Sequence, residues 1–323
     1  MAVMARPNIE RAKVVCVIPV RNGGDRWCQA AAALEKFCPS HWAIWVIDSS
    51  STDHSMEPVH AYGWSSLTIQ AHDFDHGATR NLALEHCHEA DYLVFLTQDA
   101  IVSDVQALPE LMSAFEDPLV GLAYGRQLPH ADASVLAQHL RHFNYPEKSR
   151  VWDESAIRRL GMRAVFNSNS FAAYRVAALR QIGGFPEQII LAEDMIAAWC
   201  ILRKHWRLAY VASACVYHSH NYSWAQEFAR YFDVGVMHDE WPRLLKECGT
   251  AQGEGWRYVA HLFRHLWQCR RSLLLDAAAL VVLKYLAYRL GRWHWYLPRR
   301  LCQSLSSQKN YWQAAPSIFS RVS

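Results

Sequence analysis

The segment Tyr92–Ala100, with the sequence YLVFLTQDA, most constrains the fold of this chain. Its first part is apolar without interruption, which predicts a strand buried on both faces, as in the centre of a parallel sheet. The run ends on one acid, Asp99, with Gln98 beside it. Ligands of open α/β sheets bind beyond the carboxyl ends of such strands, where a carboxylate can hold a divalent cation against a diphosphate. The other role that suits Asp99 is the N-cap of a following helix, and this segment alone favours the cap.

Strands and helices alternate along the first half of the chain, which indicates a parallel, doubly wound α/β sheet. The other predicted strands are Val14–Pro19, Ala43–Asp48, Leu67–Ala71, Val120–Tyr124, Ser170–Arg175 and Leu208–His218. The predicted helices are Asp25–Phe37, Ala78–His88, Ala192–Lys204 and Trp224–Cys248. The pattern is weaker over residues 131–169, where we expect loops and one helix.

Cysteine usage and the first residues of the chain predict a cytosolic protein. The nine Cys residues are odd in number and form no C-x-x-C pair, which is typical of a reduced protein and not of a disulfide framework or a zinc ribbon. The first 13 residues lack an apolar run, so we expect no signal peptide. A length of 323 residues allows one large or two small domains.

Basic residues gather in one stretch near the C-terminal end. Between residues 256 and 300 the chain holds nine Lys or Arg residues and a single acid, Asp276, a net charge of +8. The whole chain carries only +3, so the remainder is mildly acidic. This asymmetry predicts an anionic partner, and on charge alone a membrane surface and a nucleic acid are both candidates.

The segment after Trp256 is predicted to form an amphipathic helix. Basic and polar side chains lie within about 120° on a helical wheel: Arg257, His261, Arg264, His265, Gln268 and Arg271. The opposite face holds Leu262, Phe263, Leu266, Trp267, Leu273 and Leu274. Such a helix suits a membrane interface, and it equally suits an ordinary surface helix packed on the core. Charged residues keep the following run, Leu273–Leu290, below the roughly 18 apolar residues of a membrane span, so we predict a helix pair that lies on a membrane without crossing it.

Polar loops follow the predicted strands at the edge where a ligand would bind. The first strand runs into VIPVRNGG, where proline ends the ladder and the glycines turn the chain. The second runs into VIDSSSTD, whose carboxylate and hydroxyls suit a nucleobase or a ribose. In FDHGATRN, Arg80 can reach a phosphate or stack on a base, although a solvated helix Arg is the commoner case.

Two later segments carry groups suited to catalysis or to a metal. Glu193 and Asp194 open an apolar helix, where an acid is rigidly placed to act as a general base or simply complements the helix dipole. His218 and His220 lie two residues apart on an extended segment, so both point to one side, which suits a metal ion.

Together these segments resemble a known family. Seven motifs follow one another over about residues 13–224: VCVIPVRNGG, VIDSSSTD, FDHGATRN, FLTQDA, GGFPE, AEDM and HSHNY. In order and spacing they resemble the family 2 glycosyltransferases. The resemblance implies the GT-A fold, a Rossmann-like, mostly parallel mixed sheet flanked by helices. FDHGATRN followed by TQDA resembles in particular the bacterial rhamnosyltransferases of O-antigen and related cell-wall polysaccharides.

The resemblance also implies roles for individual residues. Asp194 would be the catalytic base, with Glu193 its neighbour in the acceptor site. Asp99 and His218 would hold Mg²⁺ or Mn²⁺. The donor nucleotide sugar would contact Pro19, Arg21, Asp48, Ser49, Ser50, Arg80, Gln98 and Asp99. The chain departs from the family at Thr97, which replaces the first acid of the Asp-x-Asp motif, so strict metal dependence is in doubt.

On this basis we expect an inverting transfer of a sugar, L-rhamnose from dTDP-L-rhamnose, to a polyprenyl-diphosphate-linked saccharide. Residues 1–250 would form the GT-A catalytic domain, with a nucleotide-sugar half over about 13–127 and an acceptor half over about 128–250. Residues 251–323 would form a basic, Trp-rich segment that binds the anionic cytoplasmic face of the bacterial inner membrane, as a peripheral protein with no nucleic-acid partner. Two alternatives remain open: a sugar nucleotidyltransferase, and a nucleic-acid-binding module that uses the basic helix.

Overall fold

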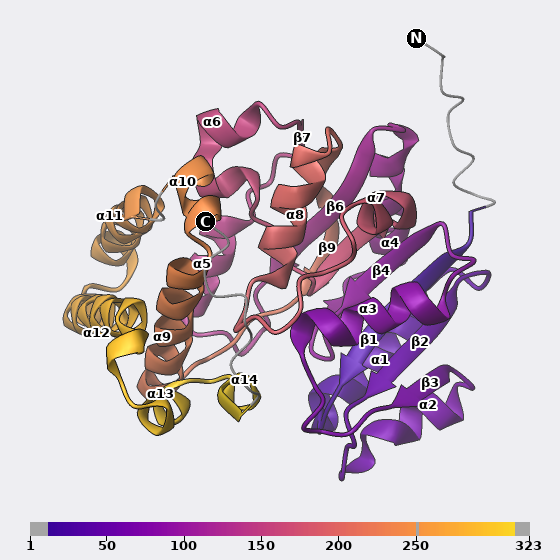
Figure 1. Ribbon diagram of the computed structural model, residues 1–323, viewed down its shortest axis with the longest axis horizontal. Coiled ribbons are helices and arrows are strands. Elements are labelled where there is room, and N and C mark those ends of the chain that lie inside the picture. Colours follow the sequence, from indigo (N-terminus) through magenta and orange to yellow (C-terminus); the bar gives the residue numbers. More distant parts are fainter. Residues whose placement is uncertain (1–11, 250–251, 314–323) are drawn as a thin grey trace.

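The computed structural model describes residues 12–249 and 252–313 (Figure 1). The N-terminal stretch for which we expect no signal peptide lies mostly outside the described residues, as do the last ten residues of the predicted C-terminal segment.

One nine-stranded mixed sheet forms the centre of the protein, in the order β3-β2-β1-β4-β8-β6-β9-β5, with β7 also paired to β9. The strands are β1 (Val14–Val20), β2 (Ala43–Asp48), β3 (Ser65–Thr68), β4 (Tyr92–Leu96), β5 (Ile101–Val102), β6 (Val120–Leu128), β7 (Arg150–Trp152), β8 (Phe171–Arg175) and β9 (Arg207–Tyr217). The predicted parallel arrangement is found in the first half, where β1 pairs in parallel with β2 and β4, and β2 with β3. Strand β8 then inserts antiparallel between β4 and β6.

Strand β4 lies in the centre of this sheet, and all five of its residues are buried. Its alternate side chains pack into the two separate cores on the two faces of the sheet, with Leu93 and Phe95 in one and Val94 and Leu96 in the other. The uninterrupted apolar run of the sequence therefore reflects burial on both faces, as expected of a strand covered by helices on both sides.

Helices cover both faces of the sheet (Figure 1). One core includes side chains of α1 (Gly24–Phe37), α2 (Glu57–Ala61) and α4 (Ala107–Ser113). The other includes side chains of α3 (His76–His86), α6 (Ala156–Leu160), α7 (Val176–Gln181), α8 (Glu193–Arg203) and α10 (Pro242–Cys248). Helix α5 (Val135–Asn144) follows β6. Short 3₁₀ turns occupy His54–Met56, Ala114–Glu116, Gly161–Ala164, Arg271–Leu273 and His294–Tyr296.

The C-terminal helices pack beside the sheet as an added layer (Figure 1). They are α9 (Trp224–Glu240), α11 (Gln252–Cys269), α12 (Leu274–Arg292), α13 (Arg299–Leu305) and α14 (Lys309–Gln313). The predicted helix Trp224–Cys248 is divided in two, because Pro242 starts a new helix where it needs no N–H partner. Helices α9 and α12 cross at two glycines: a Cβ on Gly291 would lie 2.0 Å from the carbonyl oxygen of Phe232, and one on Gly235 would lie 2.3 Å from that of Tyr288.

The apolar face predicted for α11 is directed mainly toward the protein. Leu262 and Leu266 are buried in a small cluster with residues of α5 and α12, whereas Trp267 remains 58% exposed. A second apolar stripe faces outward; it holds Leu275, Val282, Tyr285 and Leu286 of α12 and the C-cap residue Trp293. None of the described helices is long and apolar enough to cross a membrane.

Candidate active site

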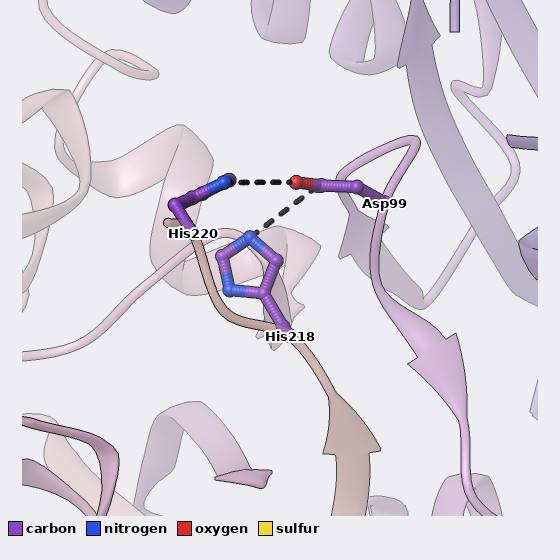
Figure 2. Close-up of side chains that lie close together, drawn as sticks. All are labelled: Asp99, His218 and His220. Carbon is purple, nitrogen blue, oxygen red and sulfur yellow. Dashed lines mark ion pairs between the residues drawn. The ribbon is translucent and has the colours of Figure 1, made fainter. Parts of the chain in front are cut away.

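Asp99, His218 and His220 form a compact cluster at one edge of the sheet (Figure 2). Asp99 lies in the turn after β4, and the two histidines follow β9. His218 Nε2 is 3.3 Å from Asp99 Oδ1, and His220 Nδ1 is 3.6 Å from Asp99 Oδ2. Strand β5 begins two residues after Asp99, so no helix follows directly and the N-cap alternative is excluded. The predicted one-sided placement of the two histidines is confirmed.

Electrostatics in this cluster favour an ionised Asp99 carboxylate and a neutral His220 imidazole. Burial raises the pKa of Asp99, but the hydrogen bond and charge of His218 outweigh it and hold the pKa well below its usual range. Burial and the neighbouring His218 lower the pKa of His220 to about 4. A carboxylate and neutral imidazoles are the protonation states that bind a metal ion.

The donor set fits a divalent cation of the Mn²⁺ or Mg²⁺ type. Three ligand atoms, one from each side chain of the cluster, lie within 4.8 Å of one another. Imidazole suits transition metals and carboxylate suits Mg²⁺ and Mn²⁺, so this mixed set favours Mn²⁺ of the two. Thr97 supplies no carboxylate, and His220 is placed where it could supply a third ligand atom instead. His220 was not among the predicted metal ligands, although its position beside His218 was noted as suitable.

Three loops that follow β1, β2 and β4 are joined by hydrogen bonds. The Arg21 N–H donates to Gln98 Oε1 at 2.7 Å, and Gln98 Nε2 donates back to the Arg21 carbonyl at 3.3 Å. Asn22 connects the first loop to the second, since its Oδ1 accepts from Thr52 N at 2.8 Å. Gln98 therefore shapes the loop that carries Arg21, and its amide is already engaged. Pro19 itself lies within β1, which continues to Val20, so the proline does not end the strand as predicted.

The residues of VIDSSSTD are placed by their own loop. Asp48 is buried and accepts from the Ser51 N–H at 3.1 Å. Ser49 is fully buried, and its hydroxyl has no hydrogen-bond partner among the described residues. Ser50 has φ of 55° and donates to the carbonyl of Ile69 at 2.7 Å. A positive φ at a non-glycine residue is a strain typical of functional loops.

A hollow of about 400 Å³ lies next to this loop. It is lined by Thr68, Ile69, Gln70, Asp73, Ala78, Thr79 and Leu82. Thr68 pairs with Asp48 across β2 and β3, so the hollow borders the predicted nucleotide loop. The sequence did not predict this hollow. Strand β3 is short, and no acid stands directly after it to mark a binding loop.

Asp194 and Glu193 start α8 after a strained residue, Ala192, which has φ of 70°. Asp194 accepts from the Met195 N–H at 2.7 Å and from the Asn169 N–H at 3.3 Å. Burial, and next the charge of Glu193, raise the pKa of Asp194 to about 7. A carboxyl that titrates near neutrality is suited to proton transfer.

Glu193 is turned inward and paired with Arg80. The Arg80 Nη1 atom lies 3.0 Å from Glu193 Oε1, and both side chains are nearly fully buried. Although burial raises the pKa of Glu193, the charges of Arg80 and His76 outweigh it and lower the pKa. Arg80 also donates to the His76 carbonyl at 2.8 Å. The Arg80 guanidinium thus pairs with Glu193 inside the protein. The sequence predicted instead a direct contact of Arg80 with a phosphate or a base.

The motif FDHGATRN is docked against GGFPE. A Cβ on Gly77 would lie 1.9 Å from the carbonyl oxygen of Pro186, so only glycine permits this approach. Asn81 exchanges two hydrogen bonds with the backbone of Phe185, at 2.9 and 2.8 Å. This part of the motif therefore fixes the loop that leads to Asp194.

Two further groups of residues escaped the prediction. Asn167 and Asn169 hold the acid pair: Asn167 donates to the Asp194 carbonyl at 2.9 Å, and Asn169 donates to Glu193 Oε1 at 3.2 Å. Their only signal in the sequence was the polar run NSNS before a predicted strand. Gln127, which hydrogen-bonds His218, and Arg141, which donates to Gln127, had no signal.

Comparison with known proteins identifies the family of this chain. Residues 15–183 match Glycosyl transferase family 2. The chain is 42% identical to an O-antigen chain rhamnosyltransferase of Salmonella anatum, over 92% of this chain and 94% of that protein. It is 41% identical to an O-antigen chain rhamnosyltransferase of Salmonella typhimurium, over 93% and 96% of the two chains.

Solved structures share the fold at low sequence identity. A mannosyltransferase of Pyrobaculum calidifontis, in complex with GDP-Man and Mn²⁺, superposes with a TM-score of 0.60 at 17% identity, over 88% of this chain and 87% of that one. Staphylococcus aureus TarS 1-349, in complex with UDP-GlcNAc, gives a TM-score of 0.53 at 16% identity, over 91% and 84%. The predicted GT-A fold is confirmed, and the chain belongs to glycosyltransferase family 2.

Proposed function

We propose that this glycosyltransferase moves L-rhamnose from dTDP-L-rhamnose onto a polyprenyl-diphosphate-linked saccharide in O-antigen synthesis. The observation that carries this proposal is the identity of 42% to an O-antigen chain rhamnosyltransferase over nearly the full length of both chains. The two alternatives, a sugar nucleotidyltransferase and a nucleic-acid-binding module, are not favoured, because the family match and both of these relatives are glycosyltransferases.

Asp194 is the proposed general base of an inverting, single-displacement reaction. The acceptor hydroxyl oxygen forms a bond to the anomeric carbon while the bond from that carbon to the diphosphate oxygen breaks. Asp194 takes the proton of the hydroxyl, and the nucleoside diphosphate leaves with the bonding electrons. A carboxylate with a pKa of about 7 is basic enough to accept this proton and is still ionised in a large fraction of molecules at neutral pH.

The cluster of Asp99, His218 and His220 would hold a divalent cation. When bound, such a cation offsets negative charge on the diphosphate. The mannosyltransferase that shares this fold was solved with Mn²⁺, which supports the choice of ion. Three protein ligands, one of them a carboxylate, predict moderate affinity, so Mn²⁺ in solution should stimulate the reaction.

The donor nucleotide is proposed to lie over the loops that follow β1 and β2. Pro19 and Arg21 on one side and Asp48, Ser49 and Ser50 on the other border this position, and the hollow beside Thr68 would take the base. Arg80 and Gln98 would act through the residues that they hold, Glu193 and the Arg21 backbone.

The C-terminal helices are proposed to bind the anionic cytoplasmic face of the inner membrane. Large apolar and aromatic side chains are exposed along residues 256–296: Trp256, Trp267, Leu275, Val282, Tyr285, Leu286, Trp293, Trp295 and Tyr296. We call these side chains the aromatic surface. Basic residues lie among them, and Arg289 stacks on Trp293 with its guanidinium carbon 5.0 Å from the ring centre. Exposed aromatic and basic side chains together are typical of an interfacial protein.

A panel of nucleotide sugars, with and without Mn²⁺, tests the proposed donor. The purified chain is mixed with each sugar and a polyprenyl-diphosphate saccharide, and the release of nucleoside diphosphate is measured. We expect dTDP-L-rhamnose to give the highest acceptor-dependent rate. Preference for another nucleotide sugar would overturn the donor assignment and leave the family unchanged.

A further inference from the structure

Two arginine side chains near the candidate active site have no acidic partner. Arg141 of α5 is half-buried and donates to the side chain of Gln127 on β6, and its Nε atom is shielded from solvent without a hydrogen-bond partner in the described part of the chain. Arg230 of α9 is exposed, and neither arginine forms an ion pair with another of the described residues. A guanidinium is always charged, and one that is shielded from water usually has an anionic partner. The two side chains are therefore suited to bind an anion.

The acids nearest to Arg230 along α9 are engaged with other groups. Glu227, one turn before it, pairs with Lys284 of α12 at 3.0 Å. Asp233, one turn after it, is buried and accepts a hydrogen bond from the Ser307 N–H at 2.9 Å. Neither carboxylate forms an ion pair with Arg230, so its guanidinium donors remain available to a ligand.

Aromatic rings connect the two guanidiniums to the candidate active site. The guanidinium carbon of Arg230 lies 6.0 Å from the ring centre of Tyr222, and that ring stacks on His220 with 4.8 Å between the ring centres. The guanidinium carbon of Arg141 lies 5.9 Å from the ring centre of Tyr145. Burial raises the pKa of Tyr145 to about 12; the charges of Arg141 and Arg230 oppose this shift, and the charge of the proposed general base adds to it. Since these charges act on one ring, both guanidiniums and the base lie around Tyr145.

The two arginines lie on the side of the sheet away from the loops proposed for the donor. Helix α5 follows β6 and helix α9 follows β9, whereas the donor loops follow β1 and β2. In the order of the strands, β4 with Asp99 after it separates β1 and β2 from β6 and β9 (Figure 1). Helix α9 also packs on α12, which carries part of the aromatic surface. Arg141 and Arg230 are thus placed on the side from which a lipid-linked acceptor would approach.

We propose that Arg141 and Arg230 bind the diphosphate of the lipid-linked acceptor, in a site separate from the Asp99 cluster. This inference rests on the proposed function, which supplies a polyprenyl diphosphate. Guanidinium groups present their N–H donors in a planar fork that matches phosphate oxygens, and two of them can bind both phosphates. The donor brings a second diphosphate, and two like-charged groups in one site repel each other unless each has its own counter-charge. A divalent cation at Asp99 would serve the donor, and the two arginines serve the acceptor.

Binding of farnesyl diphosphate, a short polyprenyl diphosphate without a sugar, tests this site. The full-length protein is titrated in a calorimeter with EDTA present, so that no divalent cation takes part. We expect Arg141→Gln and Arg230→Gln each to raise the Kd for farnesyl diphosphate about tenfold or more, since each variant loses hydrogen bonds to a charged group. Farnesol has the same chain and no phosphate, so its Kd should be equal in wild type and both variants. The Kd for dTDP should also be unchanged, because the donor loops lie elsewhere.

Arg180→Gln is the matched control. Arg180 of α7 is exposed like Arg230, forms no ion pair with a described residue and donates to the His88 carbonyl at 3.1 Å. It lies beyond the opposite end of β4, because β8, the strand before α7, runs antiparallel to β4. This variant should keep the wild-type Kd for farnesyl diphosphate. Arg230→Lys, which keeps the charge but not the fork, should restore part of the affinity that Arg230→Gln loses.

The proposal is overturned if either folded glutamine variant binds farnesyl diphosphate as tightly as wild type, or if wild type binds it no more tightly than farnesol. Variants that weaken the binding of dTDP rather than that of farnesyl diphosphate would also overturn it, because the two arginines would then serve the donor. Circular dichroism establishes that each variant is folded. The titration needs neither a sugar donor nor transfer, so its failure is distinguishable from failure of the proposed rhamnosyl transfer.

Discussion

Asp194 combines burial with a negatively charged neighbour, and both disfavour its ionised form. Since a protonated carboxyl cannot accept the acceptor's proton, activity should depend on pH through this group. We expect kcat/KM to rise with pH and to reach half of its plateau near pH 7, measured with dTDP-L-rhamnose and a lipid-linked acceptor. Glu193→Gln removes the neighbouring charge and should move this midpoint to lower pH.

The Asp194→Asn variant is the control for this assignment. It should lower kcat by about 10²- to 10⁴-fold, the usual contribution of a general base, while dTDP binds with nearly the wild-type Kd. A variant that turns over at the wild-type rate, or a wild-type profile that is flat between pH 5 and 9, would exclude Asp194 as the base.

Removal of the Asp99 carboxylate should uncouple donor binding from the metal. In Asp99→Ala, two buried or half-buried imidazoles lose their acidic partner, and the site loses its only carboxylate. We expect Mn²⁺ to leave the calorimetric Kd for dTDP unchanged in this variant and to lower it in wild type. Asp104→Asn, an exposed acid five residues further on, should behave as wild type. Equal Mn²⁺ effects in wild type and Asp99→Ala would contradict the metal assignment.

Residues differ in how visible they are in the sequence. Asp99, Asp194 and His218 could be predicted because each stands at the end or start of a strongly patterned element. Gln127 could not, since its partner His218 is 91 residues away and the contact depends on the register of β6 on β9. The roles of Arg80 and Gln98 were predicted incompletely for the same reason: the sequence shows the side chain but not the group that it contacts.

Among the elements, the crossing of α9 and α12 depends on glycine. Gly291→Ala would normally favour a helix, but its Cβ would lie 2.0 Å from the Phe232 carbonyl oxygen, so the helices must separate. We expect the free energy of unfolding in urea to fall by about 1–3 kcal/mol, the usual cost of overpacking. Gly255→Ala in α11 is the matched control, because nothing lies within 4 Å of its added Cβ.

The control should be neutral or more stable by up to about 1 kcal/mol, as helix propensity predicts. If both glycine variants change stability equally, close packing is not what holds α12 on α9.

The sequence predicted whether a segment is a helix or a strand better than it predicted the direction in which each strand runs in the sheet. The apolar runs that became β1, β2 and β4 fixed a parallel block, because their helical connections leave little choice of direction. Strand β8 has the same kind of sequence, yet it runs antiparallel to β4 and β6 because its direction depends on the irregular stretch before it. The division of α9 from α10 had a local signal, Pro242, that the apolar periodicity obscured.

At the scale of the whole molecule, the aromatic surface should bind anionic lipid. Val282→Glu places a charge within it and should weaken binding to phosphatidylglycerol vesicles by roughly tenfold or more, since a buried Val side chain contributes about 1.5 kcal/mol or more. Val105→Glu is a matched control, because Val105 is 56% exposed and Val282 57% exposed, and Val105 lies before α4. Flotation of the full chain with vesicles measures both.

Binding should also weaken as salt is raised, because the basic side chains contribute about 1 kcal/mol each near an anionic surface. Equal effects of Val282→Glu and Val105→Glu would remove the aromatic surface from the proposal. Point variants are preferable to truncation, since α12 covers buried residues of α9 that a shortened chain would expose.

Helix α9 begins two residues after Tyr222, whose ring stacks on His220 at 4.8 Å, and it carries α12 on its side. Its 17 residues form a rod about 25 Å long. Helix α9 thus links the candidate active site to α12, one of the proposed lipid-facing helices. With the aromatic surface on the bilayer, as proposed, the reacting centre would stand at a set height above the lipid. We expect such an enzyme to select its acceptor by the distance of the hydroxyl from the membrane, because a saccharide one sugar too short or too long would present that hydroxyl at the wrong height.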